Sequence, residues 1–282
     1  MAGPLKRVLM CSAQSAMRDA DRLKWHYGPG FDPARAASQH AAFAELVAAS
    51  GAQMEWLEGR NDGLADSVFT HDPSLMTDHG AIILSMGKAL RRPEPALHEA
   101  VYARMDIPIL GRVEAPGTVE GGDCVWVDGT TLAIGRGVRT NESGIRQLAD
   151  MLSPHGIEVL GFDLPLWHGE EACLHLMSVI SPLAEDLGLV YSPLLPAAFY
   201  QLLKARGIQL VEGDADEFSA SNGLSLNVLP TAPRQVIAVA GFPRTKAAME
   251  QAGCTVQTFE ADALCIACEG GPTCLTRPIL RQ

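Results

Sequence analysis

The sequence lacks the long apolar stretches and the excess of basic residues that mark two broad classes of protein. No run approaches the length of a membrane span, and MAGPLKRVLMCSAQSAMRDA at the N-terminus has too few consecutive apolar residues for a secretory signal. Lys and Arg number 22 against 33 Asp and Glu, which gives a formal net charge of -11. A phosphate backbone or an anionic membrane requires clustered basic residues. We therefore expect a small-molecule partner, and neither nucleic acid nor membrane.

Motifs for common cofactors are also missing. No GxGxxG follows a strand-like run and no GxxxxGK[ST] occurs, so dinucleotide and P-loop interpretations have no support. The chain has 7 cysteines, an odd number, and its sequence begins with no export signal. Both observations favour reduced thiols in a cytoplasmic protein. Cys265, Cys268 and Cys274 have zinc-ligand spacing, but no second CxxC or HxxxH accompanies them. A structural zinc is the less favoured interpretation, and we expect no metal and no cofactor.

Hydrophobic residues make up 47% of the 282 residues, enough for a substantial core in one large domain or two ordinary ones. Five short apolar runs bounded by Gly, Pro or Asp predict buried strands, at residues 7–11, 80–85, 131–135, 188–193 and 234–241. Helical patterns follow at 33–50, 93–105, 141–152, 196–207 and 244–253. Further strand-like runs come after them, at 54–58, 107–114, 157–162, 208–213 and 254–260. Asn141 as an N-cap and Gly207 and Gly253 as C-caps support these helices.

The order strand, helix, strand thus occurs five times along the chain. A unit repeated at intervals of roughly fifty to seventy residues is typical of a repeat architecture, and five blades around one axis would close it. An ordinary doubly wound sheet would produce the same alternation. The periodicity alone does not decide between the two.

The C-terminal GGPTC segment places Cys274 behind Gly270, Gly271 and Pro272. Two glycines and a proline exclude an element interior, and they let the backbone approach another group closely. The ordinary alternative is a buried, inert thiol. The segment therefore predicts a shaped loop that presents a cysteine.

Three other polar clusters lie in loops or at predicted strand ends, where sites are usually built. ADSVFTHDP contains Asp66 and Asp72, APGTVEGGD contains Glu120 and Asp123, and CLHLMSVI places His175 in an apolar, strand-like run. Each also has an ordinary reading, as a turn, a solvated loop tip or a satisfied core histidine. Together with a cysteine they supply what thiol catalysis needs, because the nucleophile requires a proton shuttle and the shuttle requires an orienting acid.

Six stretches carry a family resemblance, in the order DSVFTHDP, EAPGTVEGGD, GVRTNESGIRQL, LHL, GFPRT and GGPTC. From about residue 60 to the end, the chain resembles dimethylarginine dimethylaminohydrolases, which belong with arginine deiminase and the amidinotransferases to the guanidino-group-modifying superfamily. The resemblance implies an α/β fold, a five-bladed propeller of ββαβ units with pseudo-fivefold symmetry. It also implies a single catalytic domain, residues 1–282, with the site in the central channel.

The resemblance also implies roles for individual residues. Cys274 matches the nucleophile, His175 the proton-transferring histidine and Glu120 the acid that orients it. The substrate-binding positions match Asp72 for the guanidinium, Arg91 and Arg139 for the α-carboxylate, and Asp66 near the amino-acid end. His71 stands where these relatives carry an acid, and we include it among the substrate-binding residues. Lys24 and Trp25, in a segment of poor similarity, have no assigned counterpart.

These roles imply hydrolysis of an N-substituted guanidine, first of all an N-methylated arginine, through an S-alkylthiouronium on Cys274. Relatives that act on unmethylated arginine typically carry an Asp two residues after the histidine, where this chain has Met177. An apolar side chain leaves room for N-methyl groups and removes one acceptor for free N–H groups. One alternative is arginine deiminase or amidinotransferase activity. A second alternative is that the protein binds a guanidine or zinc and has no catalytic activity. The sequence does not decide whether the protein forms a homodimer.

Overall fold

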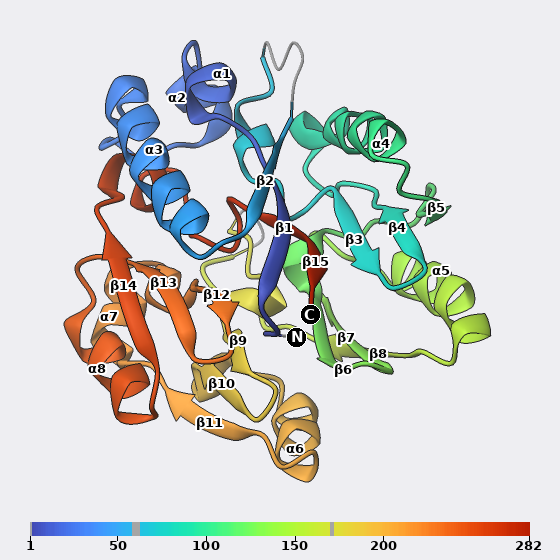
Figure 1. The fold of residues 1–282 in the computed structure, drawn as a ribbon. Coiled ribbons are helices and arrows are strands. Elements are labelled where there is room, and N and C mark those ends of the chain that lie inside the picture. The colour runs from blue at the N-terminus through green and yellow to red at the C-terminus, as the bar shows by residue number, and fades with distance from the viewer. Residues whose placement is uncertain (1, 58–62, 170–171) are drawn as a thin grey trace. The chain divides into compact units, whose positions relative to one another are not determined.

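The computed structural model describes residues 2–57, 63–169 and 172–282, and in this part of the chain it contains five three-stranded sheets (Figure 1). Cα packing divides the chain into two compact units. The described residues of 71–179 and 192–209 form the first unit, and those of 2–70, 180–191 and 210–282 form the second.

The first unit holds two of the sheets. In one, the strand order is β3 (Ser74–Thr77), β4 (Gly80–Ile83) and β5 (Ile109–Arg112). In the other, it is β6 (Cys124–Asp128), β7 (Thr131–Arg136) and β8 (Glu158–Asp163). The α-helices of this unit are α4 (Glu94–Arg104), α5 (Glu142–Leu152) and α6 (Ala197–Ala205).

The other three sheets belong to the second unit. The strand order of one sheet is β15 (Arg277–Arg281), β1 (Leu5–Met10) and β2 (Gln53–Trp56). The order of the next is β11 (Gln209–Glu212), β10 (Leu187–Val190) and β9 (Ile180–Ala184). The order of the last is β12 (Leu229–Ala232), β13 (Gln235–Val239) and β14 (Thr255–Phe259). Its α-helices are α1 (Ala13–Met17), α2 (Arg22–Trp25), α3 (Pro33–Ala49), α7 (Ala215–Ala220) and α8 (Pro243–Gln251). Because β15 pairs with β1, the two ends of the chain share one sheet.

The sheets repeat one connection pattern. In the first unit, β3 and β6 run antiparallel to their neighbours β4 and β7, which then pair in parallel with β5 and β8 across α4 and α5. The β12–β13–β14 sheet has the same order around α8. Parallel neighbours need such a crossover, usually a helix, whereas antiparallel neighbours can follow a short turn. The observed unit is therefore ββαβ.

All five predicted strand–helix–strand segments are confirmed, with ends shifted by a few residues. Glu58, the last residue of the strand predicted at 54–58, lies outside the described residues. Asn141 caps α5 as predicted, since its side chain accepts from the Gly144 N–H. Gly207 and Gly253 adopt left-handed backbone angles one residue beyond the observed C-caps of α6 and α8.

The apolar patterns of the sequence did not indicate one strand in every sheet, namely β3, β6, β9, β12 and β15, although the ββαβ unit implied by the family resemblance includes it. Three of these strands contain a proline: Pro182 in β9, Pro230 in β12 and Pro278 in β15. Proline normally argues against a strand because it cannot donate to the ladder, but an edge strand tolerates it. All three strands lie at the edges of their sheets, so the partner that makes them strands is visible only in the tertiary structure.

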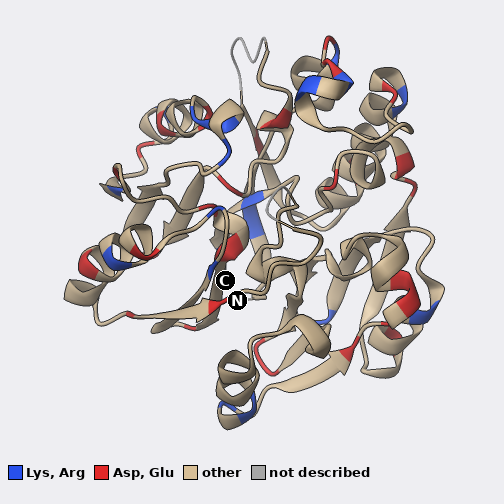
Figure 2. Cartoon of the chain, turned by 180° about the vertical axis from the view of Figure 1, so that it is seen from behind, with Lys and Arg blue, Asp and Glu red and all other residues tan. Residues whose placement is uncertain are grey.

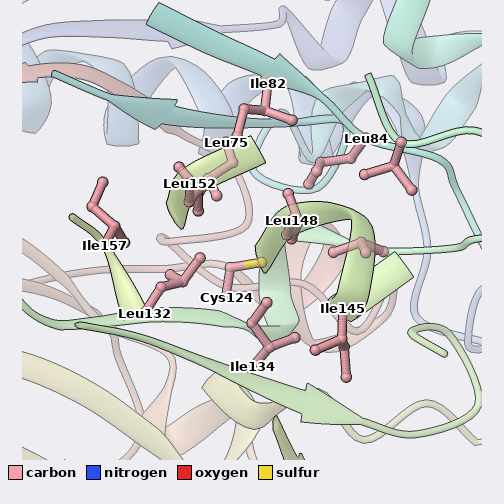
Figure 3. Close-up of a cluster of buried hydrophobic side chains, with 12 residues drawn as sticks. Leu75, Ile82, Leu84, Cys124, Leu132, Ile134, Ile145, Leu148, Leu152 and Ile157 are labelled. Atoms are coloured by element: carbon pink, nitrogen blue, oxygen red, sulfur yellow. The ribbon is translucent and has the colours of Figure 1, made fainter. Parts of the chain in front are cut away.

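A hydrophobic cluster in the first unit fixes α5 against its sheet (Figure 3). Ile145, Leu148 and Leu152 recur on one face of the helix at steps of three and four residues, and all three are buried. They pack in the cluster with Leu132 and Ile134 of β7. Burying each such side chain stabilises the fold by about 1.5–3 kcal/mol, so this face holds the loops before and after α5 in place.

Charged residues of both signs share the same elements. Helix α8, for example, carries the Lys246–Glu250 ion pair, and Figure 2 shows Lys and Arg interspersed with Asp and Glu. Within the described residues, no helix has the length and apolar character needed to cross a membrane.

Candidate active site

The predicted pair Glu120 and His175 is in direct contact in the first unit. Nε2 of His175 lies 3.0 Å from Oε2 of Glu120, and the Glu120 side chain is completely buried. Glu120 immediately precedes a 3₁₀ turn at Gly121–Asp123, and His175 precedes another at Leu176–Ser178. Two loops that are 55 residues apart in sequence thus bring the acid to the imidazole.

The prediction that His175 lies in a strand is wrong. His175 has an extended backbone, but the chain turns immediately after it. The Ser178 hydroxyl accepts from the His175 N–H, and the Ser178 N–H donates to the His175 carbonyl. This reciprocal capping closes the turn and overrides the strand-like apolar pattern.

The orientation of the imidazole follows from the same turn. The His175 side chain also accepts from the Ser178 N–H, and because Nε2 faces Glu120, the accepting atom is Nδ1. In the neutral ring Nε2 therefore carries the proton, and this N–H donates a hydrogen bond to Glu120. When the ring gains a second proton at Nδ1, the Ser178 N–H keeps the His175 carbonyl as its partner, at 2.9 Å.

Both groups of the pair are held in their charged forms. Burial alone would raise the pKa of Glu120, but the hydrogen bond and charge of His175 and the charge of Arg139 lower it to about 2. Burial alone would lower the pKa of His175, but the charges of Cys173 and Asp123 and hydrogen bonds to Cys173 and Glu120 raise it well above its usual value. The pair can therefore store a proton on the imidazole beside an ionised carboxylate.

Asp72, the predicted guanidinium ligand, lies in the same unit and is also buried. Its Oδ1 accepts from the Gly122 N–H at 2.9 Å, and its Oδ2 accepts from Nη1 of Arg91 at 2.6 Å. Burial alone would raise the pKa of Asp72, but the charge of Arg91, followed by those of His175 and His71, holds it well below its usual range. His71 is buried directly before it.

The structure brings both predicted carboxylate-binding arginines to acids of the chain itself. Arg91 is buried between Asp72 and Glu94. Arg139 is different, since its side chain is 20% exposed and its Nη1 lies 3.3 Å from each oxygen of Glu120. Arg139 therefore keeps an open side for a substrate group, whereas Arg91 is enclosed.

Asp123 anchors the two site loops to each other. Its carboxylate accepts from the Thr140 hydroxyl at 2.6 Å and from the Leu176 N–H at 3.0 Å. Gly122 beside it is required by close packing, because a Cβ there would lie 2.4 Å from Nδ1 of His175. In the sequence Asp123 stood out only as a polar residue, and the contact that gives it a role spans 53 residues.

Cys274 lies in the second unit, at the end of the predicted glycine loop. The close approach expected there is confirmed, since a Cβ on Gly270 would lie 2.2 Å from the Phe69 ring and one on Gly271 would lie 2.5 Å from the Asn227 side chain. Cys274 is partly exposed. By contrast, burial raises the pKa of the Cys265 thiol well above its usual value, and nearby Cys274 and Cys268 raise it further.

Asn227, which no sequence pattern indicated, contacts the Cys274 sulfur. Its Nδ2 donates to Sγ at 3.0 Å, and its Oδ1 accepts from the Thr273 N–H at 3.0 Å. The Thr273 hydroxyl in turn donates to the Val228 carbonyl at 2.7 Å. An N–H donor aimed at sulfur favours the thiolate over the thiol.

Asp66 lies in the second unit as well. It sits in the 3₁₀ turn Ala65–Val68, is buried, and accepts from the Tyr27 hydroxyl at 2.8 Å. Tyr27 follows α2, which contains Lys24 and Trp25. The Lys24 ammonium lies 5.8 Å from the centre of the Trp25 ring, a cation–π contact. No sequence signal distinguished Tyr27 from other aromatic residues.

Among the described residues, one group could offer three ligands to a metal ion: Glu120, Cys173 and His175, whose donor atoms lie within 4.8 Å of one another. A cation there would have to replace the hydrogen bond between Glu120 and His175. The group therefore fits an acid–base pair with an adjacent thiol at least as well as a metal centre. Cys265, Cys268 and Cys274 do not form such a group.

The chain is similar to several known proteins in sequence and in fold. The arginine deiminase family model matches residues 61–198. An N(G),N(G)-dimethylarginine dimethylaminohydrolase from Pseudomonas aeruginosa is 30% identical over 248 residues, covering 87% of this chain and 89% of that protein. A structure of the Pseudomonas aeruginosa enzyme complexed with citrulline covers 99% of this chain and 100% of its own, with a TM-score of 0.78 and 25% identity. An amidinotransferase from Microseira wollei is similar in fold, with a TM-score of 0.82 at 16% identity.

Proposed function

Because the chain belongs to the dimethylarginine dimethylaminohydrolase family, whose members hydrolyse C–N bonds in linear amidines, we propose that it converts an N-methylated arginine to citrulline and an alkylamine. The observation that carries the proposal is the buried Glu120–His175 hydrogen bond, with the Asp72 carboxylate in the same unit. This set supplies a proton store and an anion for a guanidinium, which is what the reaction requires.

We also propose that the five ββαβ units form a five-bladed propeller with pseudo-fivefold symmetry, as one catalytic domain of residues 1–282. The repeated sheet pattern supports this. The chemistry adds a requirement, namely that the Cys274 sulfur reach the carbon of a guanidinium bound at Asp72. We place the protein in the cytoplasm, with its cysteines reduced and a small guanidino compound as its ligand.

The first half of the reaction is attack by the Cys274 thiolate on the guanidinium carbon. Delocalised charge makes that carbon a poor electrophile, so a strong, soft nucleophile is needed. The Asn227 N–H supports the thiolate, and the bound cation favours it further. Asp72 accepts guanidinium N–H groups on its remaining lone pairs and holds the carbon in line. As the carbon–nitrogen bond breaks, His175 gives its proton to the departing alkylamine, which leaves an S-alkylthiouronium.

The second half is hydrolysis of that intermediate. His175, now neutral, takes a proton from water, and the resulting hydroxide attacks the thiouronium carbon. The carbon–sulfur bond then breaks, Cys274 returns as thiolate, and the hydroxyl proton of the adduct passes to solvent, which leaves a neutral ureido group on the product. Glu120 keeps the imidazole oriented through both steps and stabilises its protonated form. One water is consumed, and one amine and one urea are formed.

Arginine deiminase activity is the second candidate, because the matching family model is that of arginine deiminase. Met177, in the 3₁₀ turn after His175, argues against it by placing an apolar side chain where a second carboxylate would grip an unmethylated guanidinium. Product analysis with arginine and dimethylarginine in parallel decides the question. Ammonia released from arginine at a rate comparable to dimethylamine release would favour the deiminase.

The central experiment is intact-mass measurement after acid quenching with dimethylarginine. The wild type and a Cys254→Ser control should both show an adduct of the substrate less one amine, and Cys274→Ser should show none. Cys254 is a buried cysteine directly before β14, so it controls for loss of a thiol. An adduct that persists in Cys274→Ser would refute the nucleophile assignment. Stoichiometric zinc with an unreactive Cys274 would favour a binding protein without catalysis.

A further inference from the structure

A buried threonine, Thr140, connects the loop of Glu120 to the carboxylate of Asp123. Its hydroxyl donates to Oδ2 of Asp123 at 2.6 Å and accepts from the Glu120 N–H at 3.2 Å. The exposed fractions of Thr140, Glu120 and Asp123 are 0%, 0% and 1%. A hydroxyl offers one proton and two lone pairs, so it can make both bonds at once. Thr140 therefore ties the backbone of the orienting acid to a second buried carboxylate.

Asp123 extends this connection to the loop of His175. Its Oδ1 accepts from the Leu176 N–H at 3.0 Å, and Leu176 directly follows His175 in the chain. The Asp123 N–H donates to the Glu120 carbonyl at 3.0 Å and closes the turn after the acid. Burial raises the pKa of Asp123 to about 6, so near pH 8 it is ionised and both of its oxygens accept. Hydrogen bonds thus run without a break from the Glu120 N–H, through two buried side chains, to the residue after His175.

The Glu120 carboxylate is held by a different set of contacts. Its Oε1 accepts from the Lys88 N–H at 3.0 Å, and Nη1 of Arg139 lies 3.3 Å from each oxygen. Its Oε2 faces Nε2 of His175. These contacts fix the carboxylate, whereas the path through Thr140 fixes the two backbones that carry the acid and the imidazole. The spacing between the acid and the imidazole therefore depends on that path.

We propose that Thr140 and Asp123 are positioning residues that hold the His175 imidazole against the Glu120 carboxylate while His175 transfers its proton. The proposal rests on the proposed function, which assigns proton transfer to His175. Both positioning side chains are buried and bonded within the protein. They act through Glu120 and His175 and not on the substrate.

Proton transfer makes the reaction sensitive to this alignment. A group that transfers a proton must lie within about 2.6–3.2 Å of its partner, and a displacement of about 1 Å costs about a hundredfold in rate. Nε2 of His175 lies 3.0 Å from the acid that orients it. Without the Thr140 hydroxyl, the Glu120 N–H and Oδ2 of Asp123 would lose a buried partner, which is unfavourable. The two loops would shift toward other partners, and the imidazole would move with them.

Substrate binding depends much less on the Thr140 hydroxyl. The Thr140 carbonyl accepts from the Gly137 N–H at 3.0 Å. The next residue, Asn141, donates through its N–H to the Thr118 carbonyl at 3.1 Å. These backbone bonds remain when the hydroxyl is removed, so Arg139 keeps its place and its open side. We therefore expect kcat and KM to respond differently.

The test compares Thr140→Val, which keeps the shape of the side chain and removes the hydroxyl, with Thr140→Ser, which keeps the hydroxyl. Thr245→Val is the matched control in the second unit, because the buried Thr245 hydroxyl also accepts from a backbone N–H, that of Asp214 at 3.2 Å. The measurements are kcat and KM with dimethylarginine at pH 8 and the free energy of unfolding in urea. Proton NMR of the His175 Nε2–H, assigned by its absence in His175→Gln, reports the alignment without turnover.

We expect kcat to fall about a hundredfold in Thr140→Val while KM stays within about threefold of the wild type. Thr140→Ser should recover most of that loss, because its hydroxyl can make both bonds. Thr245→Val should lose a similar amount of stability to Thr140→Val, since each loses one buried hydroxyl, but it should turn over at the wild-type rate. The Nε2–H signal should move upfield or broaden in Thr140→Val and stay in place in Thr245→Val.

Thr140→Ala is the second variant if Thr140→Val does not fold. It leaves space in which the two loops can relax, and kcat should still fall by about tenfold or more, with KM near the wild-type value.

A wild-type kcat in Thr140→Val, with an unmoved Nε2–H signal, would overturn the proposal. Equal losses in Thr140→Ser and Thr140→Val would also contradict it, because the shape of the side chain and not the hydroxyl would then matter. A rise in KM as large as the fall in kcat would assign Thr140 to substrate binding instead. If the wild type does not turn over N-methylated arginines, the proposed function fails, and the Nε2–H signal still decides whether the hydroxyl aligns the imidazole.

Discussion

The side-chain amide of Asn227 donates a hydrogen bond to the Cys274 sulfur over 3.0 Å, and the same side chain accepts from the Thr273 N–H. The pairing joins a residue that precedes β12 to the C-terminal loop, 47 positions away. The glycine at 271 makes room for it, because any Cβ there would overlap the Asn227 side chain. The sulfur is thus presented with a donor already aimed at it.

Asn227→Asp should make Cys274 less reactive. The carboxylate keeps the acceptor for the Thr273 N–H, but it replaces the donor to sulfur with a negative charge, which raises the pKa of the thiol. We expect iodoacetamide to alkylate Cys274 about tenfold more slowly at pH 7, the change that about 1.4 kcal/mol produces. Peptide-resolved mass spectrometry measures the rate, and Asn222→Asp is a control at a neighbouring loop asparagine. Equal rates in the wild type and Asn227→Asp would show that the contact does not tune the thiol.

Gly122→Ala should reduce turnover without unfolding the protein. The added methyl group would meet Nδ1 of His175 at 2.4 Å, so the imidazole must move away from Glu120. A displacement of about 1 Å at a proton-transfer group costs about a hundredfold in rate. Gly129→Ala is the matched control, because nothing lies within 4 Å of a Cβ there. The prediction fails if both variants turn over dimethylarginine at the wild-type rate.

Asp123 should make stability depend on pH. Burial is the main reason that the pKa of Asp123 rises to about 6 in the folded protein, whereas an aspartate in the unfolded chain titrates near its usual value of about 4. Between these values the folded state binds more protons, so the free energy of unfolding falls as pH rises, by on the order of 3 kcal/mol. Asp123→Asn lacks this contribution.

Urea unfolding of the wild type and Asp123→Asn at pH 4, 5, 6 and 7 isolates the effect. The stability of the wild type relative to the variant should decline across this interval and then level off above the folded pKa. Asp216→Asn, at an exposed acid in α7, is a suitable control because it keeps Asp123. The stability of the wild type relative to Asp216→Asn should therefore show no such decline. A difference that stays constant from pH 4 to pH 7 would contradict the role of Asp123.

Met177→Asp should shift preference toward unmethylated arginine. A carboxylate at this position supplies a second acceptor for free guanidinium N–H groups and crowds N-methyl groups. One hydrogen bond to a charged group contributes about 1.5–3 kcal/mol, so the ratio of kcat/KM for arginine over dimethylarginine should rise by about tenfold or more. Met177→Leu, which keeps the side chain apolar, is the control. An unchanged ratio in Met177→Asp would remove the sequence argument for methylated substrates.

His175→Ala should abolish turnover while dimethylarginine still binds. Proton transfer is a transition-state role and contributes about 10²–10⁴-fold to rate, whereas the guanidinium is held by Asp72. Steady-state rates and calorimetric binding in the same variant separate the two. A loss of affinity as large as the loss of rate would contradict the assignment.

Local signals in the sequence determined the five helices α3, α4, α5, α6 and α8 and the two strands that each of them connects, but not the short helices α1, α2 and α7. The three- and four-residue spacing of apolar side chains gave α5, and Asn141 gave its first turn, because these interactions lie within a few residues of each other. The Gly270–Gly271 loop was predictable for the same reason. The prolines in β9, β12 and β15 gave the opposite signal, and only sheet pairing shows these strands to be edges.

The residue types of the site could be read from the sequence, but their partners could not. The family resemblance assigned Asp72 and Arg91 to opposite ends of a substrate, and the tertiary structure joins them in one buried ion pair. Glu94, Asp123, Tyr27 and Asn227 gained their roles only through contacts that folding creates. The reason is physical: a hydrogen bond or a pKa depends on the distance and burial of groups that distant segments bring together, and neither quantity is encoded in a local pattern.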